Sequence, residues 1–311
     1  MKLEGIHHIT AITGDAVGNV EFYVGVLGLR MVKKTVNQDD PTVYHLFYGD
    51  EHGSPGMDLT FFEYPGAARG RVGAGMVHRI VWRVSSEATL AFWQQRLDAR
   101  GIDTTLTDDS LLFADPEGLA HELLLSKQEQ EPLIALAADI PGEHALRGFD
   151  GVRAYAVDPV RSEGLLGETL GFTKDGSGRW EARGERRSGF YAYDAALADA
   201  VPVPGAGTVH HVAFASLPED HEAWRERLMQ AGAHATPIID RFYFRSIYFR
   251  EPSGVLFEIA TIGPGFAVDE DEEHLGERLS LPPRFEPLRA QLDGTLTPLP
   301  DPRLLHGQPG A

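Results

Sequence analysis

The sequence predicts an α+β fold in which one small unit, a strand followed by a helix and several further strands (βαβββ), occurs four times in tandem. Three observations predict it. Short apolar runs open the units, glycines that fit helix ends follow at a repeated distance, and a proline-containing turn precedes a glutamate-bearing strand twice. Repeated spacing of this kind is the sequence signature of a repeated supersecondary unit.

The first and third units share the spacing between their opening strand and the end of their helix. Gly28 follows His8 by 20 positions, and Gly171 follows Gly151 by 20 positions. Both glycines fit the position after a helix, where a positive φ is favourable only for glycine. We therefore expect a strand and then a helix before each of them.

The second and fourth units share the spacing of their closing strands. Each opens with an apolar run that contains histidine and continues with a helical segment that ends in glycine. Glu122 follows Pro116 by six positions, and Glu258 follows Pro252 by six. The two glutamates are therefore expected at equivalent places on equivalent strands.

Turn residues between short apolar runs predict the remaining strands. The strand candidates are Val43–Tyr48, Asp58–Tyr64, Ser110–Phe113, Gly189–Tyr193 and Tyr243–Phe249. The chain divides into residues 1–126 (two units), 127–148 (a connection), 149–262 (two units) and 263–311 (an acidic, proline-rich tail).

The tail carries two features of its own. Its acidic run at 269–273 is typical of a solvated or loose segment. Three apolar residues spaced for a helix, Phe285, Leu288 and Leu292, are expected to anchor one short helix against the body.

Composition limits the classes of partner. Lys and Arg number 28 against 46 Asp and Glu, which gives a net charge of −18, and cysteine is absent. A field of that sign repels nucleic acid and anionic lipid. No apolar run approaches the length of a membrane span. We expect a cytoplasmic protein that binds a small molecule, with a homo-oligomer left open.

Two doubled histidines carry the chemistry. His7-His8 and His210-His211 each open a strand-like run, and Glu258 lies on a third strand. Two imidazoles and one carboxylate on separate strands are the ligand set of an open non-haem iron site. Because neighbours on a strand point to opposite faces, only one histidine of each pair is expected to face the metal.

The repeat and these motifs resemble the vicinal-oxygen-chelate superfamily, and most closely its ring-cleaving dioxygenases that act on hydroquinones. The matching stretches, within residues 4–290, are 5–10, 44–50, 209–214 and 263–266. The resemblance implies two open β-barrel-like domains and a metal held by His8, His211 and Glu258. The implied metal is Fe(II), with Mn(II) as the alternative.

Ligands from the first and fourth units can meet only if those two units share one barrel. The second and third units must then form the other barrel. That barrel carries a partial echo of the ligand set in His78 and Glu122, but Gly151 stands where the first unit has His8. Since glycine cannot bind a metal through a side chain, we expect the second barrel to be metal-free and structural.

The resemblance also implies catalytic residues around the metal: His7, Thr10, His210, Arg241 and Tyr248. Tyr248 would hydrogen-bond a substrate oxygen or relay a proton, and Arg241 would favour an anionic substrate or stabilise developing negative charge. The ordinary alternatives are a core aromatic and a surface ion pair. Strand alternation turns His7 and His210 away from the metal.

The activity implied is opening of a 1,4-dihydroxy aromatic ring with O₂, and the small partners are therefore an aromatic diol and O₂. Three alternatives stay open: an extradiol dioxygenase of catechols, a glyoxalase-like isomerase, and a bleomycin-resistance-like binding protein. An isomerase generally needs a second carboxylate. The first unit has Phe61 six positions after Pro55, with Glu63 two positions further along that strand, so the isomerase is disfavoured.

Overall fold

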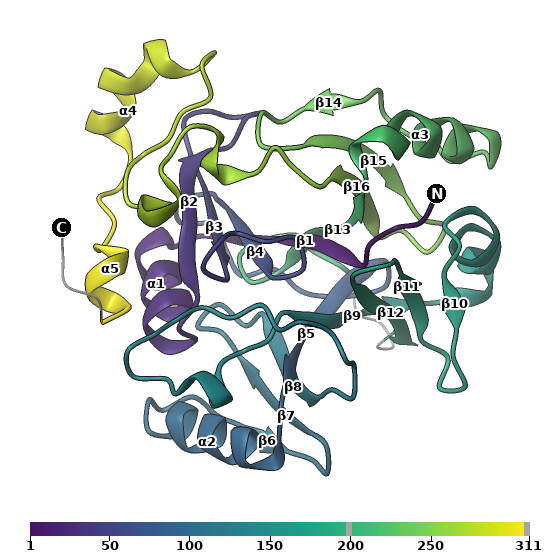
Figure 1. Ribbon diagram of the computed structural model, residues 1–311, viewed down its shortest axis with the longest axis horizontal. Coiled ribbons are helices and arrows are strands. Elements are labelled where there is room, and N and C mark those ends of the chain that lie inside the picture. The colour runs from purple at the N-terminus through teal and green to yellow at the C-terminus, as the bar shows by residue number, and fades with distance from the viewer. Residues whose placement is uncertain (197–200, 308–311) are drawn as a thin grey trace.

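The computed structural model describes residues 1–196 and 201–307, so positions 197–200 of the third unit and 308–311 of the tail lie outside it. The fold is α+β, with two eight-stranded sheets (Figure 1). The first sheet has the order β14-β15-β16-β13-β1-β4-β3-β2 and the second the order β10-β11-β12-β9-β5-β8-β7-β6. The first unit thus shares a sheet with the fourth, and the second with the third, which confirms the predicted pairing.

The strands of the first sheet are β1 (Ile6–Thr13), β2 (Arg30–Val36), β3 (Tyr44–Gly49), β4 (Asp58–Glu63), β13 (Val209–Ser216), β14 (Ile239–Asp240), β15 (Arg245–Arg250) and β16 (Leu256–Thr261). Those of the second are β5 (Met76–Val84), β6 (Thr105–Leu106), β7 (Ser110–Ala114), β8 (Ala120–Leu125), β9 (Phe149–Ala156), β10 (Thr173–Lys174), β11 (Trp180–Arg183) and β12 (Ser188–Ala195). Each predicted strand is present with small shifts at its ends. In β15, for example, Tyr243 and Phe244 belong to the preceding loop.

The helices differ in type between units. The second and fourth units carry α2 (Glu87–Asp98) and α3 (His221–Gln230). The first unit has a short α1 (Ala16–Val20) that continues as a π-helical segment, and the third has a 3-10 turn and a π-helical segment. The π-helical segments are η1 (Glu21–Val26) and η4 (Gly164–Thr169), and the 3-10 turn is η3 (Pro159–Ser162). No helix in the part of the chain that the structure describes is long and apolar enough to cross a membrane.

The predicted glycine positions are confirmed. Gly28 follows η1 with a φ of 67°, and Gly171 follows η4 with a φ of 74°. A residue with a side chain would be strained at both places, because the left-handed region is readily open only to glycine. The chain therefore turns from each helical segment into the next strand at a glycine.

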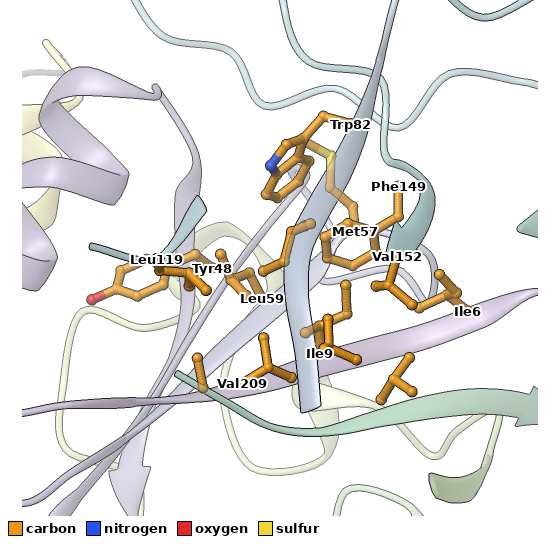
Figure 2. Packing of buried hydrophobic residues seen from close by; sticks show 14 of the residues in the cluster. Ile6, Ile9, Tyr48, Met57, Leu59, Trp82, Leu119, Phe149, Val152 and Val209 are labelled. Carbon is orange, nitrogen blue, oxygen red and sulfur yellow. The ribbon is translucent and has the colours of Figure 1, made fainter. Parts of the chain in front are cut away.

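One apolar core lies between the two sheets. Figure 2 shows Ile9 and Leu59 of the first sheet near Trp82 and Val152 of the second. All eight residues of β1 are buried, because one face of this strand packs on the core and the other lines the site described below. Burying a large apolar side chain contributes about 1.5–3 kcal/mol, so β1 is held firmly by its core face.

The acidic run of the tail is solvated, as predicted, only over 271–273, and its first two residues are tied to the body of the protein. Glu270 is buried and forms an ion pair with Lys33 of β2, whose side chain is 0% exposed. Lys33 Nζ also donates to Asp269 Oδ1 at 2.8 Å and to the carbonyl of Phe266 at 3.0 Å. A buried ammonium must be paired, and this run supplies the charges.

The expected tail helix is confirmed. Leu292 of α4 (Arg289–Thr295) is buried in a cluster with Val36 and Leu281, and Phe285 and Leu288 pack against that cluster. Figure 1 shows α4 and α5 in yellow on the same side of the molecule as β2. The remaining short helical turns are η2 (Gly142–His144), η5 (Pro218–Asp220), η6 (Phe266–Val268), η7 (Glu272–His274), η8 (Glu286–Leu288) and α5 (Pro302–Leu305).

Candidate metal centre and pocket

Three side chains from adjacent strands converge on one point. His8 lies on β1, His211 on β13 and Glu258 on β16. The Nε2 atoms of the two histidines lie 3.2 Å apart, and Glu258 Oε2 lies 3.2 Å from that of His8 and 2.9 Å from that of His211. Within the described residues, these three form the one buried group of His, Asp or Glu whose ligand atoms all approach within 4.8 Å.

The chemistry of this group fits a divalent cation. Glu258 Oε1 is buried without a hydrogen-bond partner among the described residues, and Oε2 has the two imidazole nitrogens beside it. Burial alone would raise the pKa of Glu258, but the imidazoles of His8 and His211 hold that pKa well below its usual range. Burial lowers the pKa of His211, which keeps its ring neutral and its lone pair available. A buried charge is costly unless paired, and a cation bound by all three groups would pair it.

The other nitrogen of each histidine faces the neighbouring histidine. His8 Nδ1 lies 3.0 Å from His7 Nδ1, and His211 Nδ1 lies 2.8 Å from His210 Nδ1. His7 Nε2 lies 3.2 Å from the carbonyl oxygen of Thr261, which can only accept, so Nε2 carries the proton. His7 Nδ1 then accepts from His8 Nδ1–H, and this leaves the Nε2 lone pair of His8 pointing into the group.

The prediction that His7 and His210 turn away from the centre is therefore wrong. The register of β1 against β13 shifts twice, so that it skips His7 on one strand and His210 on the other. A bulge of this kind interrupts the alternation of side chains and re-aims one of them. Each doubled histidine thus places one ring in the centre and the next ring beside it.

A polar chain continues from Thr10 across the sheet. Thr10 Oγ1 lies 2.8 Å from Thr60 Oγ1, which lies 2.9 Å from His45 Nε2. Thr10 pairs with Thr60 as Ala213 pairs with Glu258, so Thr60 holds the place in the first unit that Glu258 holds in the fourth. The spacing from Pro55 had predicted Phe61 at that place, and the structure puts Thr60 there, one position earlier. A hydroxyl, not a carboxylate, therefore stands there.

A pocket with about 420 Å³ of empty space, its open mouth included, lies beside the centre. Its walls combine aromatic rings with uncharged polar groups and one ion pair. The lining residues are His8, Thr10, Thr35, Asn37, Gln38, Asp39, His45, Phe47, Phe62, His211, Arg241, Tyr243, Phe244 and Tyr248. The pocket therefore opens onto the side chains of His8 and His211.

Tyr248 lies beside the centre, in the lining of the pocket. It pairs with Glu258 across β15 and β16, and its ring lies edge-on to His211 with centroids 5.7 Å apart. Burial, and then the negative charge of Glu258, raise the pKa of Tyr248, so the phenol keeps its proton at neutral pH. It can therefore donate a hydrogen bond into the pocket.

Arg241 lies at the pocket wall but its guanidinium is already paired. Its NH1 and NH2 groups donate to the two carboxylate oxygens of Asp39 at 2.9 and 3.0 Å. The side chain of Arg241 is 15% exposed and that of Asp39 is 71% exposed. Arg241 also stacks over Tyr248 at 5.5 Å from the ring centroid. Arg241 therefore lines the pocket and is also half of an ion pair with an exposed carboxylate.

Sequence reasoning missed Asp39, Thr60 and Phe62. Thr60 and Phe62 could have been found, since alternation along β4 puts them on the face of Thr10. Asp39 lies in the loop between β2 and β3, and a loop carries no periodic signal. Its position follows only from the folded chain.

In the second sheet, the place that corresponds to the centre is occupied by other side chains of the protein. Glu122 accepts from Arg153 Nε at 2.9 Å and from Arg79 NH1 at 3.3 Å, so two guanidinium groups surround it. A Cβ atom on Gly151 would lie 2.4 Å from the ring of Phe190, which takes the space that a ligand side chain would need. His78 Nε2 donates to Asp194 Oδ2 at 2.9 Å instead.

Comparisons with known proteins agree with this architecture. The family model described as Glyoxalase/Bleomycin resistance protein/Dioxygenase superfamily matches residues 5–123 and 153–259. Among the relatives is "Putative ring-cleaving dioxygenase MhqA" of Bacillus subtilis, 39% identical over 96% of this chain and 100% of its own length. The chlorohydroquinone/hydroquinone 1,2-dioxygenase of Sphingobium indicum is 32% identical over 95% of this chain and 96% of its own.

Solved structures show the same likeness. A Bacillus subtilis protein named "putative dioxygenase" superposes with a TM-score of 0.89 at 38% identity, over 96% of this chain and 98% of its own. Glyoxalase I of Zea mays, at 15% identity and a TM-score of 0.60, shares the fold over 88% of this chain and 97% of its own. The chain therefore belongs to the glyoxalase/bleomycin resistance protein/dioxygenase superfamily.

Proposed function

We propose that this protein is an Fe(II)-dependent dioxygenase that opens hydroquinone-type aromatic rings with O₂, with Mn(II) as the alternative metal. The observation that carries the proposal is the convergence of His8, His211 and Glu258 beside a pocket walled by aromatic rings. The names of the relatives support the same reaction class. The hydroxyl of Thr60, at the place of a second carboxylate, disfavours the isomerase.

In this proposal the three ligand residues hold the metal. Fe(II) with three protein ligands supplies free coordination positions for a substrate oxygen and O₂, and a path for electrons between them. His7 and His210 fix the two ligand rings through their Nδ1 atoms, as partners of metal-bound histidines commonly do.

The remaining pocket residues orient the ring and handle protons. Phe47, Phe62 and Phe244 offer apolar surface to a planar diol and exclude water. Tyr248 donates a hydrogen bond to an oxygen on the substrate, and its phenol can transfer its own proton to that oxygen when negative charge develops there during ring opening. Thr10 can accept a hydrogen bond from a substrate hydroxyl, and the polar chain behind it continues through Thr60 to His45.

The test is ring opening in the presence of ¹⁸O₂. The protein is loaded with Fe(II) without oxygen, given hydroquinone and then exposed to ¹⁸O₂, with mass spectrometry of the product. The proposal predicts an acyclic product that carries ¹⁸O, and its loss in the His211→Ala variant. Consumption of O₂ with formation of benzoquinone alone would contradict it. Preference for catechol over hydroquinone would assign the reaction to the extradiol alternative.

A further inference from the structure

The charges in the pocket wall form a closed pair. Arg241 and Asp39 are the one Arg and the one Asp of the lining, which contains no Lys or Glu among the residues that the structure describes. The remaining walls are aromatic, or are neutral groups such as Asn37 and Gln38. Both N–H groups of the guanidinium fork go to the two oxygens of Asp39, which is the strong bidentate geometry for this pair.

Asp39 stays ionised in this arrangement. Hydrogen bonds from Arg241 lower the pKa of Asp39, so the carboxylate carries its charge throughout the neutral range. The loop is held in place independently of the pair. Asn37 accepts from the backbone N–H of Asp39 at 2.9 Å, and the side chain of Gln38 donates to the backbone carbonyl of Arg241 at 2.6 Å.

The pair decides which substituents an aromatic ring can carry. A carboxylate on the ring would need a cation in the pocket wall, and the guanidinium there is already neutralised. It would also approach the carboxylate of Asp39, and burying an anion without a partner is costly. A diol whose ring carries only uncharged groups meets no such cost.

We propose that Asp39 is a specificity-determining residue, which neutralises Arg241 and so restricts the pocket to aromatic diols without an anionic substituent. This inference rests on the proposed function, since it names the substrate class of the same site. Asp39 does not need to touch the reacting atoms for this role. It acts through the charge that it removes from the wall.

The variant Asp39→Asn tests the inference. It removes the negative charge, keeps the size of the side chain and leaves Arg241 without its counter-charge. Because Asp39 is 71% exposed, its loss should not disturb the core. Asp40→Asn is the matched control, since Asp40 lies in the same loop and its carboxylate bonds Thr42, not Arg241.

The readout is binding without turnover. Calorimetry under anaerobic conditions gives the Kd of hydroquinone and of 2,5-dihydroxybenzoate for the Fe(II)-loaded wild type and both variants. We expect the wild type and Asp40→Asn to bind hydroquinone the more tightly. In Asp39→Asn the preference should fall by about tenfold or more, which corresponds to one lost charge contact of about 1.4 kcal/mol.

Two results would overturn the inference. One is equal binding of the two compounds by the wild type, and the other is an unchanged preference in Asp39→Asn. If the proposed function is wrong, the result is different: neither diol is opened in air, whatever the ratio of the two binding constants. The ratio of kcat/KM for the two diols, where ring opening occurs, should follow the ratio of the Kd values.

Discussion

His7 and His210 each interrupt the ladder between β1 and β13, and each sets its Nδ1 against the Nδ1 of the next histidine. In a regular strand these rings would lie on the face opposite to His8 and His211. The bulges bring them close enough to fix the tautomer of the ligand rings. The proton of His8 then lies on Nδ1, and its Nε2 is free for a metal.

Replacement of His7 by Ala tests this positioning role. The His8 ring would keep its place on β1 but lose the acceptor for its Nδ1–H. We expect Fe(II) affinity to fall by roughly 10- to 100-fold, as is typical when the partner of a metal-bound histidine is removed. Competition with a chelator measures it. His52→Ala is the control, since the His52 side chain is 65% exposed and its partner is Glu272, not a metal ligand. Unchanged affinity in the His7 variant would count against the role.

The chain of Thr10, Thr60 and His45 makes a second residue-scale prediction. Thr60→Val removes the central hydroxyl at nearly constant volume, so we expect kcat to fall about tenfold with little change in KM. Steady-state O₂ uptake measures both. Thr60→Ser keeps the hydroxyl and should retain most of the activity. Equal loss in the two variants would mean that the site responds to packing and not to the hydroxyl.

At the scale of elements, the tail is joined to β2 by charge as well as by apolar contact. Lys33 is completely buried and bonds Asp269, Glu270 and the carbonyl of Phe266. Tyr243, which lines the pocket, donates to Asp269 Oδ2 at 3.1 Å. The tail therefore supports one wall of the pocket, and the first two residues of its acidic run belong to the folded body.

Lys33→Met should strongly destabilise the fold, because it leaves buried carboxylates without their cation. Loss of one partner of a buried pair costs about 3–5 kcal/mol. Urea unfolding measures the free energy. Lys174→Met removes a lysine from an exposed pair with Glu163 and should cost less than about 1 kcal/mol. Similar small losses in both variants would show that the tail is not held by Lys33.

At the scale of the whole molecule, a buried polar chain joins the η1 segment of the first unit to the second sheet. Trp82 Nε1 donates to His121 Nδ1 at 3.1 Å, and the Tyr23 hydroxyl lies 3.1 Å from His121 Nε2 and donates to Asp115 Oδ2 at 2.9 Å. Burial lowers the pKa of His121 to about 3, so its ring is neutral. Burial raises the pKa of Asp115 to about 6.

Asp115 therefore makes stability depend on pH. Its carboxyl ionises in the unfolded chain near the ordinary pKa of 3.8 and in the folded chain only near 6. At this group the unfolded state binds fewer protons than the folded state, so the contribution of Asp115 to the free energy of unfolding falls as pH rises from about 4 to 6, by roughly 3 kcal/mol. Buried histidines with lowered pKa values, such as His121, contribute with the opposite sign, so the effect of Asp115 is read as a difference between two proteins. Urea unfolding of the wild type and of Asp115→Asn across this range should give a difference in free energy, wild type minus variant, that falls as pH rises. Parallel profiles would contradict it.

Much of the architecture could be predicted because repeated distances between residues indicate repeated units. The equal distances to Gly28 and Gly171, and to Glu122 and Glu258, predicted the repeat, and the ligand set shared by the first and fourth units predicted their pairing. What could not be predicted depends on interruptions and on loops. Strict alternation misplaced His7, an acidic run gave no sign that Lys33 would bury part of it, and Asp39 reaches Arg241 only after the chain has folded.

The central claim is that one metal ion is held by His8, His211 and Glu258. Anaerobic equilibrium dialysis with Fe(II) tests it most directly, on the wild type and on the three single alanine variants. The wild type should bind one equivalent of iron per chain, and each variant should lose it while remaining folded by circular dichroism. A wild type that binds no iron, or variants that bind it as tightly as the wild type, would contradict the claim.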